Sequence, residues 1–308
     1  MASSPPQRYL DPKTLQRISR LDIRARQVVE GFITGAHQSP YSGFAVEFAA
    51  HREYTQGDDL RHIDWKVWSR TDRLYIKEYE EETNLNCTLI VDCSKSMRYG
   101  SDAKVPWSKF DHAATAAASL TLLLQRQQDD VGLVTFNNSI RTNLRPNSNP
   151  THLKRIVHEL ETTSVDDQTD VHQVFGELAD QISRRGLVCL FSDLFVDLDV
   201  LRRSIEKFRT RRHEMIVFHV MHNDELEFPF EENTLFRGLE MDAELHAEPR
   251  ALQKAYLEVI RRFQNNVQQM CAAAGVDYVL VDTLEPLDAV LARYLTFRQQ
   301  TRKLRQRR

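Results

Sequence analysis

Residues 87–97, CTLIVDCSKSM, predict the central strand of the fold and the point where it ends. The first five of these residues are apolar apart from Thr88, which is typical of a strand buried on both faces of a parallel sheet. Asp92, Ser94 and Ser96 follow at once. Ligands of open α/β sheets bind at the carboxyl ends of the strands, so a carboxylate and two hydroxyls here can face one ion. Such oxygen ligands suit Mg2+ or Mn2+ rather than zinc.

The same polar residues have a second interpretation, which the local pattern leaves open. Asp and Ser side chains after a strand can cap the next helix, because their oxygens accept hydrogen bonds from the free NH groups of its first turn. Further oxygen ligands at the ends of later strands would favour the interpretation as a metal site over the interpretation as a helix cap.

The composition limits the classes of protein to which the chain can belong. Its 308 residues are enough for one large or two modest domains, and 41% of them are hydrophobic. Because 41 basic residues nearly balance 44 acidic ones, no global charge favours nucleic acid as a partner. No window approaches the roughly 18 apolar residues of a membrane helix, and the first residues resemble no export signal. The cysteine spacing is typical of reduced core thiols. We therefore expect a cytoplasmic protein without direct membrane insertion.

Strand and helix patterns alternate after the central strand, as a doubly wound, mostly parallel α/β sheet requires. The residues at 131–136 and 140–144 predict an antiparallel hairpin at a sheet edge. We expect Thr151 to cap a helix, Gly186 to close the helix that begins near Thr169, and a short hairpin in an insertion at about 224–248. The remaining predicted helices are 110–127, 200–208, 251–274 and 286–297, and the remaining strands are 187–191, 215–221 and 276–282.

The N-terminal part predicts a helix and strand extension of the sheet domain. Apolar residues recur at helical spacing over 15–32, and residues 44–48 alternate as a strand. Residues 54–70 mix Asp, Arg, Lys and Trp around a short predicted helix that carries Asp64 and Trp65. We interpret them as an ion-paired structural joint, with a docking surface as the alternative. The predicted organisation is an extension at 1–82, the α/β domain at 83–300 and a basic tail at 301–308.

Oxygen-bearing side chains also follow later elements of the predicted sheet. Thr169 and Asp170 open a helix, and Asp193 ends the strand at 187–191. If that strand lies beside the central strand, these loops and the Asp92 loop converge on one point. With this set the chain resembles a von Willebrand factor A domain with its metal-ion-dependent adhesion site. The resemblance implies that Ser94, Ser96 and Thr169 touch Mg2+ (or Mn2+) directly, while Asp92 and Asp193 hold its waters.

A second motif makes the resemblance more specific. The pattern Tyr54-x-x-Gly57-Asp58-Asp59-x-Arg61-x-Ile63-Asp64-Trp65-Lys66, followed by Arg70, resembles the signature of the bacterial family called domain of unknown function 58. This family places its signature ahead of a von Willebrand factor A-like domain. The resemblance implies a metal-dependent protein-protein interaction module, an adaptor of a MoxR-type AAA+ ATPase in the assembly or remodelling of client proteins. A protein partner would supply an Asp or Glu to the ion.

Three other functions compete with this one: hydrolysis, ATP hydrolysis and nucleic-acid binding. A Mg-dependent hydrolase of phosphoesters is the alternative, with Asp170 or His172 as a base. Hydroxyl-rich sites neutralise less of the ion's charge than the sites of metal hydrolases do, so we expect no enzyme and no catalytic residue. The chain has no phosphate-binding loop of the Walker type, so any ATPase activity belongs to a partner. Its arginine clusters lack the interleaved aromatic residues of a nucleic-acid interface.

Overall fold

The computed structural model describes residues 21, 25–26, 28–29, 51–55, 65–71, 74–77, 85–100, 107–166, 171–182, 185–239, 244–288 and 292. Contacts between residues divide the chain into two compact units. The smaller unit is Ala36–Asn84, and the larger unit combines Met1–Gly35 with Leu85–Arg308. The predicted strand at 44–48, the residues around Asp64 and the basic tail lie outside the described residues.

In its described residues, the smaller unit contains a two-stranded antiparallel sheet and one helix. Strand β1 (His51–Glu53) pairs with β2 (Tyr75–Lys77), and α3 (Trp65–Thr71) lies between them in the chain. The rings of Trp65 and Trp68 meet edge to face with centroids 6.0 Å apart, and Trp65 is 59% exposed. Trp65 thus starts the helix with its side chain at the surface.

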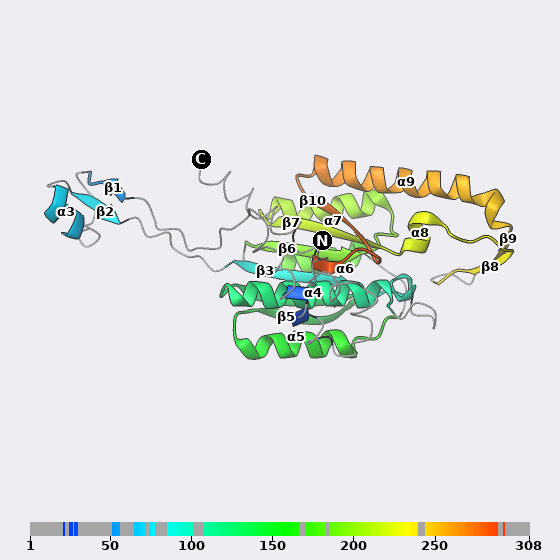
Figure 1. The fold of residues 1–308 in the computed structure, drawn as a ribbon, viewed down its shortest axis with the longest axis horizontal. Helices are drawn as coiled ribbons and strands as arrows, with labels where there is room; N and C mark the ends of the chain where they lie inside the picture. Colours follow the sequence, from blue (N-terminus) through cyan, green and yellow to red (C-terminus); the bar gives the residue numbers. More distant parts are fainter. Residues whose placement is uncertain are drawn as a thin grey trace, which may run out of the picture. The chain divides into compact units, whose positions relative to one another are not determined.

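The larger unit is built on a six-stranded sheet with the order β10-β7-β6-β3-β4-β5. All neighbouring strands are parallel except β4 and β5, which form the predicted antiparallel hairpin at the edge. This arrangement confirms the doubly wound, mostly parallel α/β fold (Figure 1). The strands are β3 (Asn86–Asp92), β4 (Asp130–Phe136), β5 (Ile140–Asn147), β6 (Leu187–Ser192), β7 (Glu214–Met221) and β10 (Asp277–Asp282).

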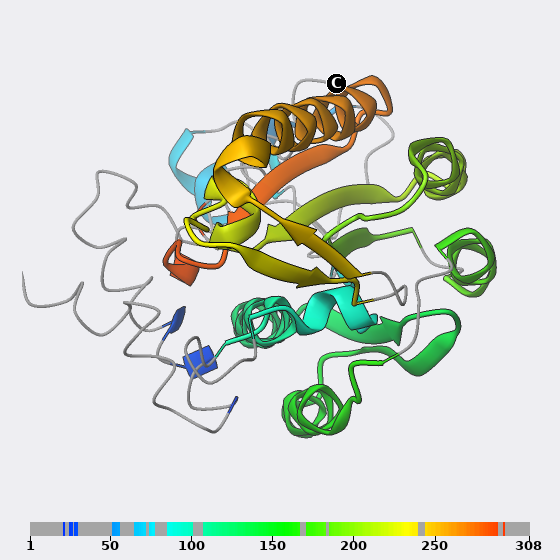
Figure 2. The same cartoon turned by 90° about the vertical axis from the view of Figure 1, so that its right-hand side faces the viewer.

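Helices cover both faces of this sheet, so the unit has two apolar cores. Helices α4 (Lys109–Arg126) and α5 (Pro150–Thr162) pack on one face. On the other face lie α6 (Val171–Gln181), α7 (Leu198–Thr210) and α9 (Pro249–Ala273), as Figure 2 shows. Side chains of β3 alternate between the cores, with Leu89 in the first and Ile90 in the second. Burial on both faces explains why the β3 sequence is continuously apolar.

Two of the predicted helix ends are wrong. Helix α5 is capped by Asn149, whose side chain accepts a hydrogen bond from the backbone NH of Thr151, so Thr151 is the second helical residue. Helix α6 ends at Gln181, five residues before Gly186. Gly186 instead lets β6 approach β3, because a Cβ atom there would lie 2.1 Å from the carbonyl oxygen of Asn86.

Residues from the beginning of the chain contribute to the first core. Leu21, Ala25, Val28 and Val29 are at most 2% exposed and belong to the cluster under α4 and α5. The backbone NH of Leu21 also donates a hydrogen bond to Glu161 Oε1 at 2.9 Å. The larger unit is therefore completed by residues that precede the smaller unit in the sequence.

The insertion after β7 adds a short helix and a hairpin. Helix α8 (Asn223–Glu227) is followed by β8 (Thr234–Arg237) and β9 (Glu244–Ala247), which pair antiparallel. The rings of four residues form a cluster at the base of the hairpin, with the centroids of contacting pairs 4.6 to 5.6 Å apart: Phe228, Phe230, Phe236 and Tyr256. Figures 1 and 2 show that the hairpin extends from the start of α9 across the carboxyl edge of the large sheet.

Candidate metal site at the carboxyl edge of the sheet

Strands β3 and β6 are neighbours in the sheet, and this pairing brings together most of the predicted site. Val91 pairs with Phe191 in parallel register, so the loops after both strands begin side by side. Asp92 ends β3, Ser94, Ser96 and Asp193 follow β3 or β6, and all four residues are at most 8% exposed. Thr169 and Asp170 lie outside the described residues, so the role of Thr169 stays a prediction.

Asp92 fixes the relative positions of the two loops through both of its carboxylate oxygens. Its Oδ1 accepts a hydrogen bond from the backbone NH of Ser94 at 2.9 Å, and its Oδ2 accepts one from the Ser192 hydroxyl at 2.6 Å. Burial, together with the nearby charge of Asp193, raises the pKa of Asp92 to about 7 in spite of these hydrogen bonds. A cation at this point would therefore favour the ionised form of Asp92.

The serine hydroxyls distinguish between the two interpretations of the loop after β3. Ser94 precedes the short 3-10 helix η3 (Lys95–Arg98), but its side chain makes no capping hydrogen bond there. Its Oγ instead lies 3.1 Å from Ser96 Oγ, and both hydroxyls are buried. Helix α4 has a cap of its own, since Ser108 and Asp111 form a reciprocal capping box. The arrangement within the described residues thus argues against a capping role for Ser94.

Lys109, which the sequence did not predict as part of the site, lies against Asp193. Its Nζ is 2.7 Å from Asp193 Oδ2 and 2.7 Å from Glu225 Oε1, and its side chain is fully buried. The ammonium also lies 4.9 Å from the centre of the Phe195 ring. Burial disfavours the ammonium, but Asp193 and Glu225 together outweigh it and raise the pKa of Lys109, so this residue is protonated near pH 7.

His219 on β7 holds the backbone of the second loop. Its Nε2 lies 2.9 Å from the carbonyl oxygen of Asp193, and its Nδ1 lies 2.8 Å from the Tyr278 hydroxyl. Burial lowers the pKa of His219 to about 4, so its ring is neutral near pH 7. The next residue after Asp193, Leu194, has φ 56° and turns the chain sharply. His219 is therefore a positioning residue for the Asp193 loop.

These side chains offer the donors that a hard divalent ion prefers. The described part of the site provides two carboxylates and two hydroxyls, all oxygen ligands. The mutual hydrogen bond of Ser94 and Ser96 leaves lone pairs on both oxygens. Among the described residues, no three His, Cys, Asp or Glu side chains surround one point, so nothing there suggests a zinc-type centre. The donor set fits Mg2+ or Mn2+.

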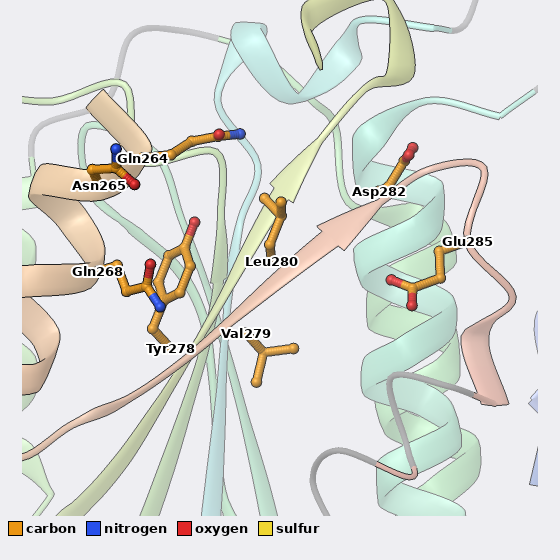
Figure 3. Close-up of a pocket in the computed structure, with 8 residues that line it drawn as sticks. All are labelled: Gln264, Asn265, Gln268, Tyr278, Val279, Leu280, Asp282 and Glu285. Carbon is orange, nitrogen blue, oxygen red and sulfur yellow. The ribbon is translucent and has the colours of Figure 1, made fainter. Parts of the chain in front are cut away.

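Other features of the described residues are separate from this site. A hollow of about 390 Å³ lies between α9 and β10, as Figure 3 shows, and it shares no residue with the site. All four cysteines are buried and none of them forms a disulfide, which confirms that they are core thiols. No helix in the described ranges has both the length and the apolar character needed to cross a bilayer. The hollow is lined by Gln264, Asn265, Gln268, Tyr278, Val279, Leu280, Asp282 and Glu285.

Two mycobacterial proteins are similar to this chain in sequence. The uncharacterized proteins Rv1480 of Mycobacterium tuberculosis and Mb1516 of Mycobacterium bovis are each 25% identical over 224 residues, which are 71% of this chain and 68% of the relative.

Solved structures with a similar arrangement are more distant. An aerotolerance-related membrane protein from Bacteroides fragilis aligns with a TM-score of 0.48 and 15% identity, over 68% of this chain and 98% of that chain. The SpRpn10 VWA domain aligns with a TM-score of 0.41 and 10% identity, over 68% of this chain and 95% of that domain. The profile of the family described as "Protein of unknown function DUF58" matches residues 50–266, which include the whole 54–70 motif and the whole Asp92 loop. The chain therefore belongs to the DUF58 family.

Proposed function

We propose that this protein is a metal-dependent protein-protein interaction module whose binding site lies at the carboxyl edge of the sheet. The observation that carries the proposal is the pair of buried hydroxyls, Ser94 and Ser96, which contact each other beside Asp92 and cap no helix. When bound there, Mg2+ would supply an open coordination position for an Asp or Glu carboxylate of the partner. Thr169 is proposed as the third direct ligand.

The distribution of exposed apolar side chains supports a binding role for this edge. Phe195 follows Asp193 and is 40% exposed, and Leu284, just after β10, is 52% exposed. Leu239 and Leu245 of the insertion hairpin are 41% and 57% exposed, and the hairpin crosses the same edge (Figure 2). Exposed apolar groups that gather on one side of a protein are typical of an interaction surface.

Charged residues beside the site complement an acidic partner. Lys95 and Arg98 are both exposed on η3, and they flank the buried Ser96. Two cations at the entrance would attract a partner segment rich in Asp and Glu. We propose, from the family resemblance, that the partner is a MoxR-type AAA+ ATPase or its client.

The bases of the hydrolase alternative, Asp170 and His172, are not among the side chains that the structure describes, and the histidine that contacts Asp193 is not suited to replace them. His219 is the histidine beside Asp193, but both of its ring nitrogens are engaged and its pKa is lowered by burial. It therefore holds the loop and is poorly placed to activate water. We propose that the protein itself does not catalyse a reaction.

The test is capture of a purified MoxR-type ATPase from the same genome by the immobilised protein. Capture should be lost in EDTA, return with Mg2+, and be absent for a folded variant with Ser94→Ala and Ser96→Ala. The matched control combines Ser119→Ala with Ser204→Ala, because both hydroxyls are buried but donate to helix carbonyls elsewhere. Capture that is unchanged by EDTA would refute the metal-dependent role. Metal-dependent phosphoesterase activity of the purified protein would show that it is an enzyme.

A further inference from the structure

The buried ammonium of Lys109 connects three parts of the larger unit. Lys109 is the first residue of α4, Asp193 belongs to the loop after β6, and Glu225 lies on α8 at the start of the insertion. Both N to O distances are 2.7 Å. The ammonium thus shares its charge between a carboxylate of the candidate site and a carboxylate of the insertion.

The position of Lys109 is unfavourable for a cation on local grounds. The N-terminus of a helix carries a partial positive charge, which disfavours lysine in the first turn. Full burial adds a large desolvation penalty for an ion of this kind. Among the described residues, the two carboxylates and the nearby Phe195 ring offset these terms, so the ammonium is held at Asp193 by specific contacts and not by the preference of the helix.

The ammonium and a divalent ion would compete for the negative charge of Asp193. Oδ2 of Asp193 already accepts from Lys109, and two cations that close together repel each other. Glu225 has the opposite effect on ion binding at Asp193. Its negative charge draws the ammonium away from Asp193 and offsets the ammonium's positive charge. The two residues therefore have opposite electrostatic effects on the same carboxylate.

We propose that Lys109 is a positioning residue that weakens divalent-ion binding at Asp193, and that Glu225 of α8 counteracts it. This inference rests on the metal site of the proposed function. Helix α8 is also joined to the loop after β3, since the Tyr99 hydroxyl donates to Asp224 Oδ2 at 3.1 Å and the Tyr99 ring contacts His222. The insertion and the ion site are therefore linked, and linkage is reciprocal: a partner that moves α8 changes the ion affinity.

The experiment measures Mn2+ binding to the full chain by calorimetry, with wild type, Lys109→Met, Glu225→Gln and the double variant. Lys109→Met should tighten binding about tenfold or more, because it removes a positive charge next to the ion. Glu225→Gln should weaken binding several-fold, and the double variant should bind about as the wild type does. Lys154→Met, on the exposed face of α5, is the matched control and should change nothing.

The opposite changes in Mn2+ affinity expected for Lys109→Met and Glu225→Gln distinguish this inference from a purely structural role and from the proposed function. A residue that only stabilises the fold would lower the melting temperature in EDTA without moving Mn2+ affinity upward in one variant and downward in the other. If the wild type binds Mn2+ and all variants bind it with unchanged or uniformly weaker affinity, the inference is wrong but the metal site is still supported. No binding to wild type or to any variant would overturn both. If Lys109→Met does not fold, Glu225→Gln decides, because unchanged Mn2+ affinity in this variant contradicts the inference.

Discussion

Asp92 has both carboxylate oxygens engaged, so its replacement affects the loops as well as any ion. Asp92→Ala should abolish Mn2+ binding in calorimetry. It should also destabilise the protein by about 1 to 3 kcal/mol, because it leaves the buried NH of Ser94 and the hydroxyl of Ser192 without their acceptor. Ser192→Ala is the control, since it removes one of these bonds but keeps the carboxylate. Unchanged Mn2+ affinity in Asp92→Ala would mean that the site was assigned to the wrong residue.

His213 gives the stability of the protein a predictable pH dependence. It is 1% exposed, and burial lowers its pKa below the usual 6.5. The folded state therefore binds its proton less readily than the unfolded state, so its contribution is complete above about pH 6.5 and is lost as the pH falls below that value. Urea unfolding of His213→Phe, which preserves an aromatic ring beside Phe208, should show a smaller loss of stability between pH 7 and pH 5 than wild type. Equal losses would contradict this assignment.

The residues of the site differ in how far the sequence could predict them. Asp92, Ser94, Ser96 and Asp193 follow apolar strands directly, so their place at the carboxyl edge follows from the alternation of elements. Lys109 gave no such signal, because lysine at the start of a helix is usually solvated. Its partners are 84 and 116 residues away in the chain, and only the packing of α4 against the sheet brings them together.

Two glycines show how the demands of a strand and of a helix differ. Gly186→Ala should cost about 1 to 3 kcal/mol or more, because its Cβ would meet the backbone of the neighbouring strand β3, which cannot move aside without disturbing the sheet. Gly176→Ala in α6 should stabilise the protein by up to about 1 kcal/mol, since its Cβ would meet only the flexible end of Lys207 at 3.2 Å. Denaturant unfolding of the two variants checks the contrast, and equal effects would show that the approach of β6 to β3 is not tight.

The hairpin of β8 and β9 is expected to contribute to binding and not to stability. Leu239→Ser with Leu245→Ser should change the free energy of unfolding by no more than about 0.5 kcal/mol for each exposed side chain. The same variant should weaken capture of the ATPase at least several-fold while Mn2+ affinity is kept. Val259→Ser, an exposed position in the middle of α9, is the control that should leave capture intact. Full capture by the hairpin variant would exclude the hairpin from the interface.

Periodicity predicted the elements themselves better than their ends. The Ala-rich pattern at 110–127 corresponds to α4 at Lys109–Arg126, and the apolar run at 187–191 corresponds to β6. Thr151 and Gly186 were misread because Asn149 is an equally good cap and because a glycine after a helix can serve the next strand instead. Such choices depend on tertiary neighbours, which a local pattern does not contain.

At the scale of the whole molecule, residues near the beginning of the chain help to close the core of the larger unit. Leu21→Ala should lower the free energy of unfolding by about 2 to 5 kcal/mol, because Leu21 is 1% exposed within the cluster under α4 and α5. Arg26→Ala, at an exposed position of the same segment, should change it by less than about 0.5 kcal/mol. Thermal and denaturant unfolding test this pair, and equal stabilities would show that the segment is dispensable for the core.

The overall architecture was predictable because strand and helix alternate, which admits few sheet topologies. The contribution of Leu21 and its neighbours to the core was not predictable in the same way. An amphipathic pattern shows that a helix covers an apolar surface, but it does not identify that surface. The amphipathic pattern at 15–32 is compatible with either unit, and only the contacts of Leu21, Ala25, Val28 and Val29 assign these residues to the larger one.

Strand β5, at the edge of the large sheet, bears on how this protein avoids aggregation. Edge strands are where folded chains join into fibrils, and charges, proline and irregular pairing discourage this. β5 carries Arg141, Arg145 and Pro146, and its register with β4 shifts twice. A second copy is thus poorly able to extend the sheet at β5, although apolar side chains are displayed at the carboxyl edge. The proposed partner-binding surface and the strand that resists self-association thus lie on different edges of the same sheet.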